Sequence, residues 1–299
     1  MVMILLTVGS ELSAEDVGGT PVPPVHEPGS EPVAAAPAAV KAVASPAWAS
    51  AVGADRFGSW ADLSVRGVTQ RMRWIAPGSF TMGSSEAEQL ATIKEGATED
   101  WVLDEKSHAV TLTAGFWLAD CACTQALWKK LSSANPSAFV GTGSLPVEMV
   151  SFDDIQQFLA DLNAVTKGSF RLPSEAEREY ACRAGTNTAF AGPSLDDLGW
   201  HKGNSMKRTH MVKTKEPNAW GLYDMHGNVY DWCADWYAPY PDGPATDPAG
   251  PAEGIAHIVR GGCWYDFPGY NRSAFRWACS PDQRDHGLGF RLCASSPLP

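Results

Sequence analysis

Helical spacing of apolar residues occurs in three segments of the chain. The first begins at Thr124 and stops before Asn135-Pro136, because a proline cannot continue the pattern. The second follows a capping box at 151–154, and the third follows a capping box at 174–177. The second segment carries an apolar stripe formed by Ile155, Phe158, Leu159 and Leu162. These patterns predict two to three helices.

Strand-like alternation appears in two stretches that precede these helices. Residues 71–84 alternate on either side of Pro77-Gly78, which predicts a hairpin. Residues 108–119 place apolar side chains at even spacing, as in a strand. Beyond residue 184 helical periodicity is scarce, and Gly, Pro, Asn and Trp indicate long loops and short strands. The whole pattern predicts an α+β fold whose long loops carry function or bind ions.

The beginning of the chain has a different composition. Residues 12–50 are rich in Pro, Ala, Val and Glu, which bury too little apolar surface to offset the entropy of ordering. We therefore predict a disordered segment at 1–55 and one folded domain at 56–299. The apolar start lacks a basic region and a cleavage site, so we expect a cytoplasmic protein. No apolar run approaches the roughly 20 residues of a membrane-spanning helix.

Composition narrows the function classes. A hydrophobic content of 44% with twelve Trp in 299 residues indicates a substantial core. The net charge of −11 argues against a nucleic-acid partner, because neutralising phosphates requires clustered Lys and Arg. The seven Cys are an odd number in a long chain, which predicts buried free thiols rather than a disulfide framework.

The stretch 257–293 has the composition of a contact surface. Two Gly-containing ends, at 259–262 and 289–292, enclose a loop that is dense in aromatic residues, Arg and Asp and contains no Lys, Glu or Met. Tyr, Trp, Arg and Asn are enriched where proteins contact ligands. We therefore predict a binding loop region at 261–292, with an unknown protein or surface ligand as its partner.

Five collinear motifs carry a resemblance to a known family. They are WIAPGSFTMGS, LPVEMVSFDD, FRLPSEAEREYACRAGT, NAWGLYDMHGNVYDWCADW and VRGGCWY with GFRL. The chain resembles formylglycine-generating enzyme (sulfatase-modifying factor) domains from about residue 60 to 294. The resemblance implies a C-type-lectin-like fold. The family includes copper and iron enzymes as well as ligand-binding variable proteins of diversity-generating retroelements, so it implies no single function.

The enzyme interpretation meets an obstacle in this sequence. The family's copper enzymes hold the metal with two Cys, and the matching positions here are Asp266 and Asn271. The His residues are scattered without helical spacing, so neither copper nor iron is expected. A remaining alternative is a metal- or thiol-dependent oxidoreductase with Cys263, Asp266 and Trp232 around a pocket. The resemblance also implies a structural calcium ion, with ligands at Gly227, Asn228, Val229 and Asp231.

The binding interpretation rests on a resemblance of the stretch 261–292 to the retroelement variable proteins. In those proteins a cassette near the C-terminus changes at selected positions. Arg260, Arg272, Arg276 and Arg291 are expected to tie the loop to acidic scaffold residues. A second interpretation is that the loop's aromatic residues pack the core. We favour ligand recognition, without a catalytic role, and expect binding at Tyr265, Asp266, Phe267, Gly269, Tyr270, Asn271, Phe275, Trp277, Cys279, Ser280, Gln283, Asp285, His286 and Leu288.

Overall fold

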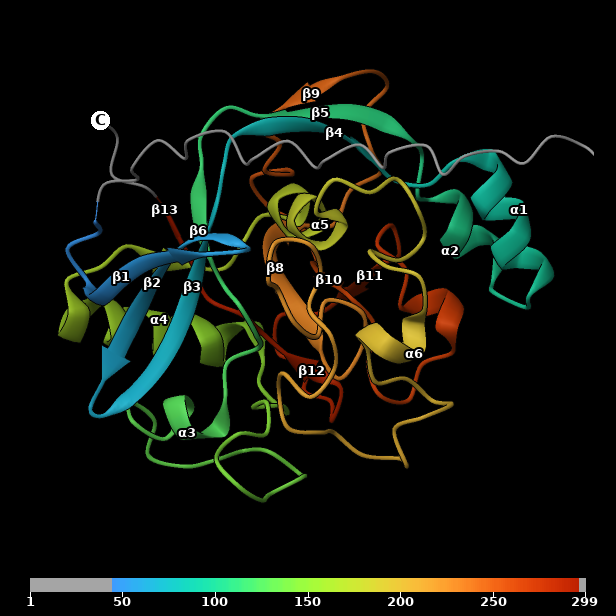
Figure 1. The fold of residues 1–299 in the computed structure, drawn as a ribbon. Coiled ribbons are helices and arrows are strands. Elements are labelled where there is room, and N and C mark those ends of the chain that lie inside the picture. The colour runs from blue at the N-terminus through green and yellow to red at the C-terminus, as the bar shows by residue number, and fades with distance from the viewer. Residues whose placement is uncertain (1–44, 296–299) are drawn as a thin grey trace, which may run out of the picture. The chain divides into compact units, whose positions relative to one another are not determined.

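The computed structural model describes residues 45–295, and these form three β-sheets with six α-helices around them (Figure 1). The disordered segment predicted at the beginning of the chain lies, up to residue 44, outside the described residues. Its predicted end at residue 55 is wrong, because Ala49–Asp55 forms strand β1. This strand pairs antiparallel with β2 (Gly58–Val65), so the folded domain begins before residue 56.

The largest sheet has six strands in the order β1-β2-β3-β6-β13-β7. Helix α4 (Phe152–Thr166) buries its apolar stripe in the same core cluster as this sheet. The stripe packs with short helix α3 (Gln125–Trp128), whose Trp128 ring stacks on Phe158 with centroids 4.9 Å apart. Both capping boxes predicted from the sequence are formed, at the starts of α4 and α5 (Glu175–Arg183). The remaining strands of the sheet are β3 (Val68–Ile75), β6 (Phe116–Ala119), β13 (Cys293–Ser295) and β7 (Phe170–Arg171).

A three-stranded sheet corrects two predictions about strand pairing. It contains β4 (Gly78–Met82), β5 (His108–Leu112) and β9 (Ala245–Thr246). The predicted hairpin at 71–84 is wrong, since β3 and β4 belong to different sheets. The single strand expected at 108–119 is two strands, β5 and β6, again in different sheets. Alternation identified the extended segments correctly, but it carries no information about their partners.

The four-stranded sheet positions the predicted binding region. Its order is β11-β10-β8-β12, and its strands are β8 (Tyr230–Trp236), β10 (His257–Arg260), β11 (Arg276–Cys279) and β12 (Leu288–Gly289). Segment 261–275 connects β10 to β11 and contains the 3-10 helix η1 (Pro268–Tyr270). Both the start and the end of the binding region are therefore built into one sheet.

Three helices of the described residues were not predicted: α1 (Glu86–Lys94), α2 (Glu99–Leu103) and α6 (Leu195–Leu198). Helices α1 and α2 lie together, on the side opposite strands β1 to β3 in Figure 1. Among residues 45–295, no helix has the length and apolar character needed to cross a bilayer.

Candidate ligand-binding site

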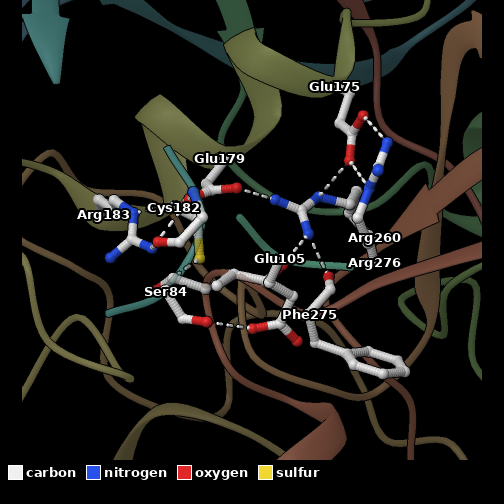
Figure 2. A network of polar contacts seen from close by, with 12 residues as sticks. Ser84, Glu105, Glu175, Glu179, Cys182, Arg183, Arg260, Phe275 and Arg276 are labelled. Atoms are coloured by element: carbon white, nitrogen blue, oxygen red, sulfur yellow. Dashed lines mark hydrogen bonds and ion pairs between the residues drawn. The ribbon is translucent and has the colours of Figure 1, made fainter. Parts of the chain in front are cut away.

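Arg260 fixes the first end of the binding region to the scaffold (Figure 2). Its buried guanidinium lies between Glu175 and Glu179 of α5 and forms an ion pair with each. It also donates hydrogen bonds to the carbonyl oxygens of Ala274 and Phe275, the first at 2.6 Å. One side chain of β10 thus joins the helix to the end of the loop, immediately before β11. A buried charge of this kind is stable only with its partners in place.

Three more arginines tie the region down, as the sequence predicts. Arg276 forms a bidentate pair with Glu175 at 2.9 and 2.8 Å, and Arg272 does the same with Glu105 at 2.8 and 2.6 Å. Arg291 donates to Asp231 at 2.7 Å. All three guanidinium groups are at most 4% exposed. The ends of the region are therefore held by ion pairs that solvent does not screen.

The two glycines after Arg260 are required by the backbone. Gly261 and Gly262 have φ angles of +99° and +70°, in the left-handed region that favours glycine. A Cβ atom at Gly262 would lie 2.5 Å from the Asn271 Oδ1 atom and 2.6 Å from the Tyr270 carbonyl oxygen. The turn therefore excludes any larger residue at this position.

A pocket of about 230 Å³ opens between the loop and helix α2. Trp101 of α2 forms one wall, and its ring meets Trp277 edge-on with centroids 4.4 Å apart. The Tyr270 ring lies 5.7 Å from Trp101 and 4.9 Å from Phe275. Trp101 was not predicted, although Thr98 before two acidic residues is a recognisable helix start. The pocket is lined by the six aromatic rings of Trp101, Tyr230, Tyr265, Tyr270, Phe275 and Trp277.

The polar lining of this pocket is acidic. The Asp285 Oδ1 atom accepts hydrogen bonds from the Tyr265 hydroxyl at 2.6 Å and from the Gly287 N–H at 2.7 Å. The Asp266 carboxylate accepts from the Cys263 N–H at 2.9 Å, and burial raises the pKa of Asp266. Gln283 completes the polar lining, and the lining residues include no Lys, Arg or His.

The predicted binding residues divide into three groups by exposure. Those exposed are Tyr265, Phe267, Ser280, Gln283 and His286, and those half-buried are Asp266, Gly269, Tyr270, Trp277 and Asp285. Those buried are Asn271, Phe275, Cys279 and Leu288.

Four of the residues expected to bind a ligand are buried. Phe275, Cys279 and Leu288 line the pocket and also belong to the core cluster. Asn271 is 0% exposed, and its amide donates to the Phe267 carbonyl oxygen at 3.1 Å, so it holds the loop rather than meeting a ligand. For Phe275, the second interpretation, core packing, is confirmed.

Two residues of the alternative catalytic centre, Cys263 and Trp232, are buried, whereas Asp266 is half-buried. Cys263 is 0% exposed, and burial raises the pKa of its thiol well above the ordinary value, so it stays protonated. Trp232 is also 0% exposed, and its indole donates to the Val150 carbonyl oxygen at 3.0 Å. Within residues 45–295, no group of three or more His, Cys, Asp or Glu side chains is arranged to hold a metal ion.

Protein donors engage most of the predicted calcium ligands, and the Asp231 Oδ1 atom is buried without a hydrogen-bond partner among the described residues. The Asp231 Oδ2 atom accepts from two guanidinium groups, of Arg178 at 2.8 Å and of Arg291 at 2.7 Å. The Asn228 carbonyl oxygen accepts from the Trp264 N–H, and the Asn228 side chain is bonded to the backbone of His210. Gly227 and Val229 supply only backbone oxygens. The positive charge that calcium would bring to Asp231 is already supplied by two arginines.

Comparison with known proteins agrees with this architecture. Residues 61–296 match the sulfatase-modifying factor enzyme 1-like domain. The formylglycine-generating enzyme of Streptomyces coelicolor is 33% identical over 192 residues, which cover 57% of this chain and 59% of that enzyme. The enzyme of Thermomonospora curvata is 34% identical over 214 residues, which cover 64% of this chain and 67% of that enzyme. The chain therefore spans less than two thirds of the Streptomyces enzyme.

Two solved structures extend the comparison to the fold. Treponema denticola variable protein 1 superimposes with a TM-score of 0.71 and 28% identity, covering 80% of this chain and 99% of that chain. PvdO from Pseudomonas aeruginosa superimposes with a TM-score of 0.67 and 26% identity, covering 84% of this chain and 98% of that chain. The chain belongs to the sulfatase-modifying factor enzyme 1-like family and has the C-type-lectin-like α+β fold that the resemblance implies.

Proposed function

We propose that this protein recognises a ligand through the face formed by residues 264–288, as a variable protein of a diversity-generating retroelement. One observation carries the proposal. The residues of this stretch that are exposed or line the pocket lie between ends that buried arginines fix to the scaffold. Exchanging such residues leaves the ion pairs intact. Surface substitutions usually change stability by less than about 0.5 kcal/mol.

One comparison and two residues support this proposal. The chain covers 99% of Treponema denticola variable protein 1, with a TM-score of 0.71. Where the copper enzymes of the family place thiols, this chain has Asp266 and Asn271. Asp266 lines the pocket, whereas the Asn271 side chain is fully buried. Neither supplies the soft ligand that copper(I) requires.

Sequencing the gene and its surroundings tests the proposal. We expect a nearby near-copy of the DNA for residues 261–292 that differs from the gene only where the copy has adenine. We also expect differences among independent isolates to fall at codons 264–288 while the arginine codons stay constant. Differences scattered evenly over the domain, with no such copy, would contradict the proposal.

Metal analysis of the purified protein addresses the oxidoreductase alternative. The proposed function requires no redox metal, so copper and iron are expected far below one equivalent per chain. A stoichiometric amount of either metal, retained through gel filtration, would favour the enzyme.

A further inference from the structure

We propose that the pocket beside Trp101 binds an organic cation, an ammonium or guanidinium group carried by the ligand. This inference deepens the proposed function and rests on it. The pocket combines six aromatic rings with two carboxylates, and no cationic side chain lines it. The rings favour an apolar or a positive group, and the carboxylates favour a positive one.

The aromatic walls supply the first part of the recognition. Aromatic faces attract ammonium and guanidinium groups, by about 0.5 kcal/mol at exposed sites and about 2 kcal/mol in desolvated ones. The rings of Trp101 and Trp277 meet at 68°, and the Tyr270 ring is inclined at 54° to Trp101. Because these rings face the pocket at different angles, they can surround a compact cation. They are less suited to stacking on a flat ligand. The volume of about 230 Å³ suits a small group of that kind.

The carboxylates supply the second part. Both hydrogen bonds to Asp285 end on its Oδ1 atom, which leaves Oδ2 without a protein donor among the described residues. Asp266 lines the same space. A purely apolar ligand would remove water from these groups without replacing its hydrogen bonds, and an anion would be repelled. A cation satisfies both the rings and the acids.

The neighbouring arginine does not cancel this preference. Arg276 lines the adjoining space on the other side of Trp277, where its charge is already matched by Glu175 and Asp104. Figure 2 shows Arg276 directed at Glu175 within the buried network. The pocket beside Trp101 therefore retains its negative character.

The pocket also joins fixed and exchangeable parts. Trp101 and Tyr230 lie outside residues 264–288, so they persist if that stretch is exchanged. Asp266 and Asp285 lie inside it. The fixed aromatic residues would then give every variant an affinity for apolar or cationic groups, and the exchangeable acids would set the charge preference of this one.

Calorimetric titration of the full-length protein with a matched pair of probes tests the inference. Choline and 3,3-dimethylbutan-1-ol have nearly the same shape, but only choline is charged. We expect choline to bind at least about tenfold more tightly than the alcohol. Equal binding of the two would overturn the inference, because it would show an apolar site.

A second arm identifies the source of the cation. A short peptide with one central Lys is compared with the same peptide carrying norleucine. Tighter binding of the Lys peptide than of choline identifies a basic side chain of a protein partner, and the reverse identifies a small free cation. If neither choline nor the Lys peptide binds, the inference fails.

Variants tie the binding to the pocket. Trp101→Ala and Asp285→Asn are each expected to weaken the binding of the tighter probe by at least about fivefold. Asp282→Asn is the matched control, since it removes an exposed acid from the same loop outside the pocket. Circular dichroism verifies that the variants fold, and the comparison of the charged and neutral probes needs no variant. Unchanged binding in both folded pocket variants would overturn the inference.

The two proposals fail in different ways. Codon differences confined to residues 264–288, together with no cation binding, would support the proposed recognition face and contradict the proposed cation site. Cation binding without such codon differences or a DNA copy would indicate a site of fixed specificity. It would contradict the proposal that residues 264–288 are exchanged.

Discussion

The ends and the middle of the binding region reverse the usual places of charged and apolar side chains. At the ends, Arg260 and Arg291 are at most 1% exposed and contact the carboxylates of Glu179 and Asp231. In the middle, Phe267 is 59% exposed, and only the Lys202 ammonium group, 3.9 Å from the ring centroid, lies over its ring among the described residues. At the ends buried charged groups stabilise the fold, whereas in the middle the apolar Phe267 is displayed. The comparison teaches that stability and recognition are assigned to separate residues of one segment.

Breaking the buried network should have the largest effect. Glu179→Gln keeps the shape of the side chain but leaves Arg260 and Arg183 without their shared negative charge. We expect the free energy of unfolding to fall by about 3–5 kcal/mol, measured by urea denaturation. The control is Arg284→Ala, which removes a half-exposed ion pair with Asp154 and should cost less than about 1 kcal/mol. Similar losses in both variants would show that burial does not distinguish the two regions.

Two phenylalanines of the loop sharpen the comparison within a single segment. Phe275 is 1% exposed and Phe267 is 59% exposed. Phe275→Ala creates a cavity and should lower the free energy of unfolding by about 3–5 kcal/mol. Phe267→Ala should lower it by less than about 0.5 kcal/mol. If the two variants lose equal stability in thermal denaturation, Phe275 is not part of the buried scaffold that holds the loop.

The free energy of unfolding should depend on pH through Asp235, which contacts the buried ion-pair network at Glu175. Asp235 accepts a hydrogen bond from the Glu175 N–H, and burial together with the Glu175 charge raises the pKa of Asp235 from 3.8 to about 7. The folded state therefore holds a proton that the unfolded state has lost. The stability from this proton is full below about pH 4 and disappears as the pH rises through about 7.

Asp235→Asn tests this titration, because an amide does not ionise. We expect the free energy of unfolding of the variant, relative to the unchanged protein, to rise between pH 4 and pH 8. One pKa unit corresponds to about 1.4 kcal/mol, so the rise should reach at least about 1 kcal/mol. Asp224, whose pKa burial raises to about 6, contributes the same sign in both proteins and does not affect the difference. Parallel stability curves would contradict the assignment.

Calcium should have the smallest effect of all. Asp231 is neutralised by Arg178 and Arg291, so we expect the same melting temperature in excess calcium and in excess chelator. A bound ion at a hundred times its dissociation constant would add about 2.7 kcal/mol. An increase of several degrees in the melting temperature with calcium would contradict this expectation and support the calcium ion that the family resemblance implies.

The sequence predicted the parts of this molecule that depend on local chemistry. The capping boxes at Ser151 and Ser174 begin real helices, because a hydroxyl three residues before an acidic side chain needs no distant partner. The arginine anchors were also predicted. Arg residues between Gly turns in an acidic chain have few stable environments other than carboxylates.

Long-range arrangement was not predictable in the same way. The alternation around Pro77-Gly78 marks two strands, but the sheets that receive them are set by distant segments. Trp101 reaches the pocket because α2 packs beside η1 and β11, and nothing in the local pattern indicates that contact. The burial of Asn271 and the neutralisation of Asp231 depend likewise on side chains far along the chain.

One stability measurement tests most directly whether the exposed residues of 264–288 are separate from the buried residues that stabilise the fold. Four exposed residues are replaced together, as Tyr265→Ser, Phe267→Ser, Gln283→Ser and His286→Ser, and thermal unfolding is followed by circular dichroism. We expect one cooperative transition with a melting temperature lowered by no more than about 8 °C, because four surface changes sum to about 2 kcal/mol. Loss of the cooperative transition, or a decrease as large as that of Glu179→Gln, would contradict the account.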